Sequence, residues 1–130
     1  MITGEKAFPI AANIGQYLRV TAGSTTADNG VPVVSLAGVA DNDIGVTTRA
    51  AFVSTAPAGQ TIDGSVTVRL RSAQGTIRYT VSGAVTTFMA PLYTAASGKV
   101  SSSQASGASL IGYSLGLATA DGDVIEVLPL

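Results

Sequence analysis

Short segments in which large apolar residues alternate with polar ones dominate this sequence. The clearest is SVTVRLRS, residues 65–72, in which Val66, Val68 and Leu70 fall on one side of an extended chain. This alternation has the two-residue period of a β-strand. No stretch of ten residues shows a convincing 3.6-residue helical period. The pattern therefore predicts an all-β chain.

Turn signals separate these segments along the chain. Asp28-Asn29-Gly30 is one, because Asn and Gly tolerate positive φ. The segments 65–72 and 76–82 flank Ala73-Gln74-Gly75, and we expect them to form an antiparallel hairpin. A chain of 130 residues suits one domain. We predict a compact single-domain sandwich or small barrel of short antiparallel strands.

The start of the chain carries the weakest periodic signal. Residues 1–16 are expected to form an irregular N-terminal arm, followed by a strand over 16–23. We therefore divide the chain into an arm with the first strand, residues 1–20, and a single β domain, residues 21–130. The N-terminus has no long apolar core, so no signal peptide is predicted. No apolar run approaches the roughly 20 residues of a membrane span.

Composition argues against several classes of function. The net charge is −1 and charged residues make up only 12% of the chain. Nucleic-acid binding depends on neutralising phosphates, so we expect no nucleic-acid partner. Arg69 and Arg71, with Arg78 nearby, are interpreted as a solvated strand face. The chain has no cysteine, which excludes disulfides and thiolate zinc sites and fits assembly in a reducing cytoplasm.

The string GYSLG, residues 112–116, matches the G-x-S-x-G pattern of serine hydrolases. A serine nucleophile needs a base, and the chain has no histidine. Lys6 and Lys99 do not lie in an S-x-x-K context. The stretch alternates as a strand would, with glycines that mark close approach of another backbone. We predict that Ser114 is structural and that the protein is not an enzyme.

Two acidic clusters are candidate metal sites, namely Asp41 with Asp43 and Asp121-Gly122-Asp123 with Glu126. An EF-hand beginning at Asp41 would need a carboxylate where Phe52 stands. Both clusters lie at expected turns, where Asp side chains bind the backbone. We therefore predict turn chemistry, with no metal and no cofactor.

An ordered series of short elements runs through the last third of the chain, residues 90–130. It comprises Leu92-Tyr93, Ser97-Gly98-Lys99-Val100, Leu110-Ile111-Gly112 and Gly122-Asp123-Val124. This series resembles the small capsid decoration proteins of tailed bacteriophages. Residues 31–47 resemble the first half of that family, although Val31 stands where the family usually has Asp, and the first 20 residues match little.

The resemblance implies a non-enzymatic protein on the virion exterior, made in the host cytoplasm. It implies a homotrimer that binds the major capsid protein at three-fold or quasi-three-fold sites and stabilises the head. The arm supplies the candidates for capsid contact, namely Phe8, Ile10, Ile14 and Tyr17. The alternative is a carbohydrate- or receptor-binding β module of a phage fibre or secreted protein. Such modules present exposed aromatic side chains, of which this chain offers few.

Overall fold

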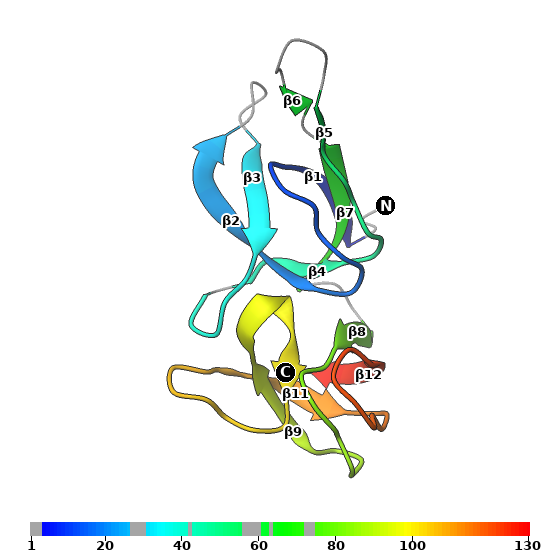
Figure 1. Cartoon of the computed structure of the whole chain (residues 1–130). Helices are drawn as coiled ribbons and strands as arrows, with labels where there is room; N and C mark the ends of the chain where they lie inside the picture. The colour runs from blue at the N-terminus through cyan, green and yellow to red at the C-terminus, as the bar shows by residue number, and fades with distance from the viewer. Residues whose placement is uncertain (1–3, 27–30, 42, 56–60, 63, 72–74) are drawn as a thin grey trace.

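The computed structural model describes residues 4–26, 31–41, 43–55, 61–62, 64–71 and 75–130. The chain is all-β, as expected, and folds into one compact domain. That domain contains a closed barrel and, beneath it in Figure 1, a curled five-stranded sheet. The described residues contain no helix long and apolar enough to cross a membrane.

The barrel is closed in the strand order β1-β3-β2-β4-β7. The predicted turn at residues 28–30 lies outside the described residues, but the strands on either side of it, β2 and β3, do pair antiparallel. A two-stranded sheet adjoins the barrel, formed by β5 (Ser54–Thr55) and β6 (Thr61–Ile62). The barrel strands are β1 (Glu5–Ile10), β2 (Arg19–Thr26), β3 (Pro32–Leu36), β4 (Gly45–Thr47) and β7 (Gly64–Leu70).

Residues 5–10 form a barrel strand, so the prediction of an irregular arm over residues 1–16 was wrong for this segment. Strand β1 pairs antiparallel with β7 along its whole length, from Glu5 opposite Arg69 to Ile10 opposite Gly64. Leu70 N donates to Gly4 O, so every second residue from Gly4 onward directs its N–H and C=O toward β7. Pro9 falls on the other alternation, where its missing N–H removes no bond to β7.

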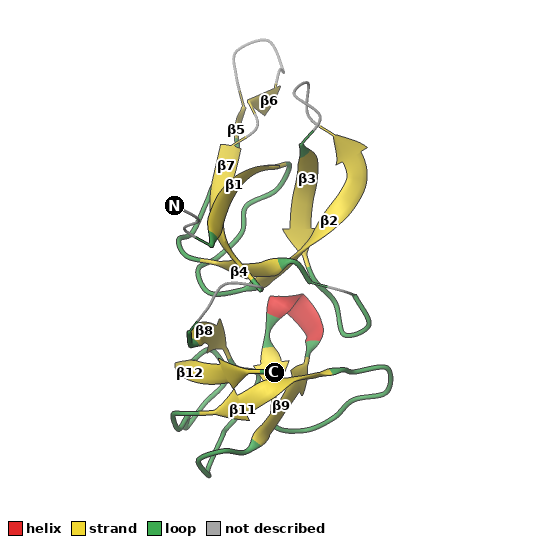
Figure 2. Cartoon of the chain, turned by 180° about the vertical axis from the view of Figure 1, so that it is seen from behind, coloured by secondary structure: helices red, strands yellow, loops and turns green. Residues whose placement is uncertain are grey.

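The remaining strands form the open sheet β10-β9-β11-β12-β8, seen from behind in Figure 2. A short 3-10 helix, η2 (Ala96–Gly98), connects β9 to β10 and lies toward the barrel. The sheet strands are β8 (Ile77–Thr80), β9 (Pro91–Thr94), β10 (Val100–Ser101), β11 (Leu110–Ser114) and β12 (Val124–Pro129).

The predicted hairpin of residues 65–82 does not form. Strand β7 pairs with β1 and β4 in the barrel, whereas β8 pairs with β12 in the sheet. The chain between these strands passes from one unit to the other. Period-two alternation fixes which residues face a core, but it does not say which strand is the neighbour.

Each unit has its own hydrophobic core. Val46, from barrel strand β4, packs into the core of the sheet and so joins the units through apolar contact. The barrel core comprises Phe8, Ile10, Ile14, Val20, Val34, Ala51, Val66 and Val68. The sheet core comprises Val46, Ile77, Tyr79, Val81, Val85, Leu92, Val100, Ile111, Ala118, Ile125 and Val127.

Candidate functional site: the junction between barrel and sheet

A buried arginine spans the junction between the two units. Arg19, the first residue of β2, has a side chain with 0% exposure. Its Nε donates to Lys99 O at 3.0 Å, and its Nη2 donates to Ala95 O at 2.7 Å and to Gly38 O at 3.2 Å. Two of these three acceptors flank η2 of the sheet. Arg19 therefore ties the barrel to the sheet through the main chain.

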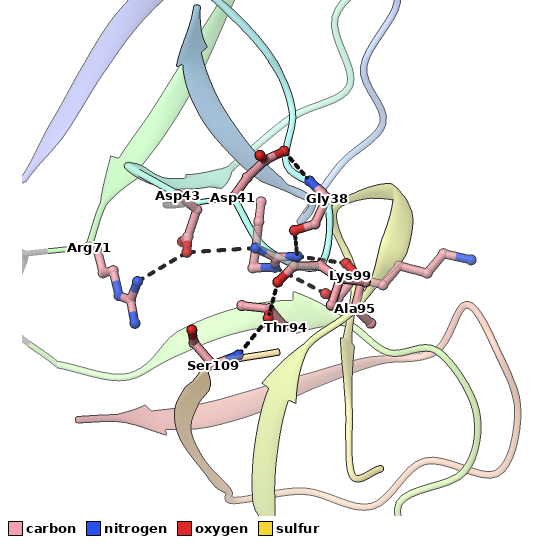
Figure 3. Close-up of polar contacts among 10 residues, drawn as sticks. Gly38, Asp41, Asp43, Arg71, Thr94, Ala95, Lys99 and Ser109 are labelled. Atoms are coloured by element: carbon pink, nitrogen blue, oxygen red, sulfur yellow. Dashed lines mark hydrogen bonds and ion pairs between the residues drawn. The ribbon is translucent and has the colours of Figure 1, made fainter. Parts of the chain in front are cut away.

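The charge of Arg19 is balanced by Asp43, which is also buried. Asp43 Oδ1 lies 3.7 Å from Arg19 Nη1 and 3.1 Å from Arg71 Nη1 (Figure 3). Burial lowers the pKa of the Arg19 guanidinium below its usual value, and Asp43 opposes that shift. Asp43 thus forms ion pairs with both arginines at the junction. Arg19 stays charged because its counterion is buried with it.

Further hydrogen bonds to main-chain groups stabilise the same junction. Thr94 Oγ1 donates to Val39 O at 2.6 Å and accepts from Ser109 N at 2.9 Å. Gly98 N donates to Ala37 O at 2.8 Å. Gly98 has a φ of 73°, and a Cβ added there would lie 2.8 Å from Arg19 O. Only glycine combines this left-handed backbone with so close an approach.

Tyr79 of β8 lies close to this charged cluster and is fully buried. Burial, and secondarily the charge of Asp43, raises its pKa to about 12. Its hydroxyl has no hydrogen-bond partner among the described residues. Tyr79 is therefore a neutral phenol, and its ring supplies packing area to the sheet core.

Arg71 was predicted to lie on a solvated strand face. The side chain of Arg71 is 39% exposed, but its guanidinium pairs with the buried Asp43. Arg19 lies within the strand predicted over residues 16–23, but its burial at the junction was not predicted. Alternation signals a face, and nothing in the local sequence shows that a second unit covers that face.

Ser114 lies in β11, and the expectation of a strand at this stretch is confirmed over Leu110–Ser114. Its hydroxyl donates to Thr87 O at 2.8 Å and accepts from Ala90 N at 3.1 Å. The side chain thus holds the loop before β9, which contains Thr87 and Ala90, against β11. The expected close approach at a strand glycine is also found, because a Cβ on Gly112 would lie 2.2 Å from Leu128 O.

Turn chemistry is confirmed at two of the acidic residues. Asp123 Oδ2 accepts from Thr119 N at 2.9 Å and Ala120 N at 3.2 Å, and these backbone bonds lower the pKa of its carboxyl. Asp41 Oδ2 accepts from Gly38 N at 2.7 Å. Among the described residues, no group of three or more carboxylates could hold a metal ion.

The four residues predicted to contact a capsid do not form an exposed surface. Phe8, Ile10 and Ile14 are buried in the barrel core. Tyr17, at a φ of 56°, is half-buried against the core of the sheet. The burial of the first three follows from the long-range pairing of β1 with β7 and of Ile14 with Ala51, which local sequence patterns do not contain. These three side chains pack inside the barrel core.

Hollows on the surface of the described part include one along β3 and one over the sheet. One, of about 360 Å³, lies along β3 and is lined by Ala11, Ala12, Asn13, Ile14, Val33, Val34, Ser35 and Leu36. The other, of about 400 Å³, lies over the sheet and is lined by Tyr17, Arg78, Leu115, Gly116, Leu117, Val124, Ile125 and Glu126. Neither brings together a nucleophile and a base of the kind that catalysis needs.

Comparison with known proteins finds a similar solved structure but no similar sequence. No protein-family model and no curated protein matches the chain. Among solved structures, the chain is similar to the N base of head fiber gp8.5 of bacteriophage phi29. The TM-score is 0.66 at 12% sequence identity, over 97% of this chain and 92% of that one. The barrel and the sheet are therefore shared together, as one fold.

Proposed function

We propose that this chain is a non-enzymatic structural protein of a bacteriophage virion that binds the capsid exterior and stabilises the head. The observation that carries the proposal is the fold match to the base of a phage head fiber over 97% of the chain. The match covers both the barrel and the sheet, so it does not rest on one common β motif.

The resemblance in residues 90–130 to capsid decoration proteins points to the same class by an independent route. It supports the finer proposal that the protein assembles as a homotrimer on the major capsid protein at three-fold or quasi-three-fold sites. A net charge of −1 suits a partner that is protein rather than nucleic acid. The buried hydrogen bonds of Ser114 support a structural role for that residue.

The physics of stabilisation follows from linkage. A protein that binds the assembled shell, and not its dispersed subunits, stabilises the shell by mass action. Three copies bound as one trimer add their contacts with little further loss of entropy, because the second and third contacts are intramolecular. Weak contacts of single subunits thereby sum to a firm attachment.

A carbohydrate- or receptor-binding module is the second candidate, favoured by two exposed aromatic side chains. Phe52 is 70% exposed and Phe88 is 66% exposed. Phe52 follows barrel residue Ala51, whereas Phe88 belongs to the loop held by Ser114 in the sheet unit. Glycan-array binding that is lost in both Phe52→Ala and Phe88→Ala would favour this candidate over the virion role.

The test uses undecorated, expanded phage heads. Purified protein is mixed with heads, or with unassembled major capsid protein as the control, and the heads are sedimented and heated. We expect co-sedimentation with heads, little binding to unassembled subunits, and a higher temperature of head disruption. Light scattering during gel filtration should give a trimer. A protein that neither sediments with heads nor protects them would contradict the proposal.

A further inference from the structure

The barrel has a seam between β1 and β3. These two strands run parallel, and Ile10 opposite Val34 is their one register pair among the described residues. Strand β1 ends there, while β3 continues to Leu36. Beyond Val34, β3 keeps β2 on one side only. The groove of about 360 Å³ lies on the other side.

The main chain of β3 is directed into this groove at Leu36. Ala37 N donates to Arg19 O at 3.0 Å, so Ala37 turns its main chain to β2. Main-chain groups of a strand alternate between its two edges. Ser35, opposite Thr21 of β2, therefore shares the direction of Ala37, and Leu36 points the other way. Its N–H and C=O lie on the groove side.

The opposite wall is held in place from behind. Ile14 N donates to Ala51 O at 2.9 Å, and Ala51 N donates to Ile14 O at 2.8 Å. Asn13 Oδ1 accepts from Val53 N at 2.9 Å. The segment 11–14 is thus bound to residues 51–53 and cannot fold onto β3 without breaking these bonds. The groove is built into the barrel.

The lining of the groove defines the chemistry of an occupant. None of its lining residues is ionisable, and Ile14 and Val34 form an apolar floor. A strand edge beside an apolar, uncharged floor fits an extended backbone, whose main chain pairs with the edge while alternate side chains enter the groove. Charged segments are disfavoured, because no counter-charge lines the walls.

We propose that this groove receives an extended, uncharged segment of the major capsid protein, which adds as a strand to the open edge of β3. The identity of the occupant rests on the proposed function. In this arrangement the shell supplies the strand and this protein supplies the edge, since β1 is already paired with β7 inside the barrel.

The test places a charge in the groove without touching the core. Ala12 is exposed at the groove wall, and Ala105 is exposed in a loop of the sheet unit. We expect Ala12→Arg to weaken binding to undecorated heads by at least about tenfold, and the matched control Ala105→Arg to stay within about twofold of wild type. Both variants should keep the wild-type circular dichroism and thermal midpoint.

A second measurement holds even if Ala12→Arg folds poorly. The chain has no cysteine, so Ala12→Cys and Ala105→Cys each carry a single thiol. We expect a maleimide probe to label both free proteins, and head binding to slow labelling at Ala12→Cys only. Hydrogen exchange of peptides covering β3 should also slow on heads.

The outcomes separate the two proposals. Equal head binding by wild type and a folded Ala12→Arg, or unprotected labelling at Ala12→Cys on heads, would overturn the groove and leave the virion role intact. Loss of the homotrimer in Ala12→Arg would show that a second copy fills the groove, which also contradicts the inference. If wild type does not bind heads, the proposed function fails, and the groove inference fails with it.

Discussion

The barrel and the sheet are built from similar strands, but only the barrel closes on itself. The barrel joins ends that are far apart in sequence, since β1 pairs with β7 along its whole length. The sheet draws mostly on near neighbours, with β9 paired to β10 and β11, and β11 paired to β12. Local signals can therefore describe the sheet, whereas the barrel depends on contacts that no local signal contains.

The two units differ again at their shared boundary. Their cores are apolar, but the junction between them holds the buried charges of Arg19 and Asp43 beside the apolar contact of Val46. Buried ion pairs are weak sources of stability and fix geometry by penalising arrangements that leave a charge unpaired. We infer that Arg19 fixes the orientation of the barrel relative to the sheet.

The largest expected effect comes from breaking that boundary. Arg19→Leu leaves the carbonyls of Gly38, Ala95 and Lys99 without their donor, and it removes the buried partner of Asp43, which keeps only the partly exposed Arg71. Removing one partner of a buried pair typically costs about 3–5 kcal/mol of unfolding free energy. Urea denaturation should show that loss, and probes in the barrel and the sheet should no longer unfold together.

Arg71→Ala is the control for this prediction. It removes the partly exposed partner of Asp43 and leaves Arg19 in place, so we expect a loss of only about 1 kcal/mol. A loss in Arg19→Leu no larger than that in Arg71→Ala would show that the junction does not depend on Arg19.

The second test asks whether close packing limits both units equally. A Cβ on Gly45 of the barrel would lie 2.1 Å from Arg69 O, and one on Gly112 of the sheet 2.2 Å from Leu128 O. Gly45→Ala and Gly112→Ala should each lose about 1–3 kcal/mol. At Gly116 the nearest atom, Ile125 Cβ, is 3.4 Å away, so Gly116→Ala should change stability little. Equal thermal midpoints for all three variants would contradict this packing.

This contrast also shows what the sequence could and could not predict. The all-β class, strand β11 and the Asp123 turn were predictable, because alternation and turn residues act over a few neighbours. The strand role of residues 5–10 was not, because Pro9 and the even spread of apolar residues hide the alternation until β7 is known. The Arg19 junction was equally hidden, since a buried arginine has the same local pattern as a solvated one.

A smaller effect is expected at Ser114, inside the sheet unit. Ser114→Ala removes a donor to Thr87 O and an acceptor for Ala90 N, and leaves those groups partly buried. We expect a loss of about 1–3 kcal/mol in urea denaturation. A fluorophosphonate probe should label neither wild type nor the variant. Labelling of wild type that disappears in Ser114→Ala would overturn the structural role.

The smallest effect at neutral pH is expected at Tyr79. Its hydroxyl has no partner among the described residues, so Tyr79→Phe should change stability at pH 7 by less than about 1 kcal/mol. The pKa of Tyr79 is about 12 in the folded protein and 10 in the unfolded chain. The tyrosine therefore leaves the free energy of unfolding unchanged below pH 10 and lowers it as pH rises from 10 toward 12. Wild type should therefore lose more stability than Tyr79→Phe above pH 10. Parallel alkaline curves would contradict the buried phenol.

The virion role is tested most directly by cryo-electron microscopy of expanded heads incubated with the full-length protein. We predict added density on the exterior at three-fold or quasi-three-fold positions, into which three copies fit with barrel and sheet in the arrangement described. An extended segment of the shell protein should lie against β3. Heads that show no added density, at concentrations at which the free protein is fully trimeric, would contradict the account.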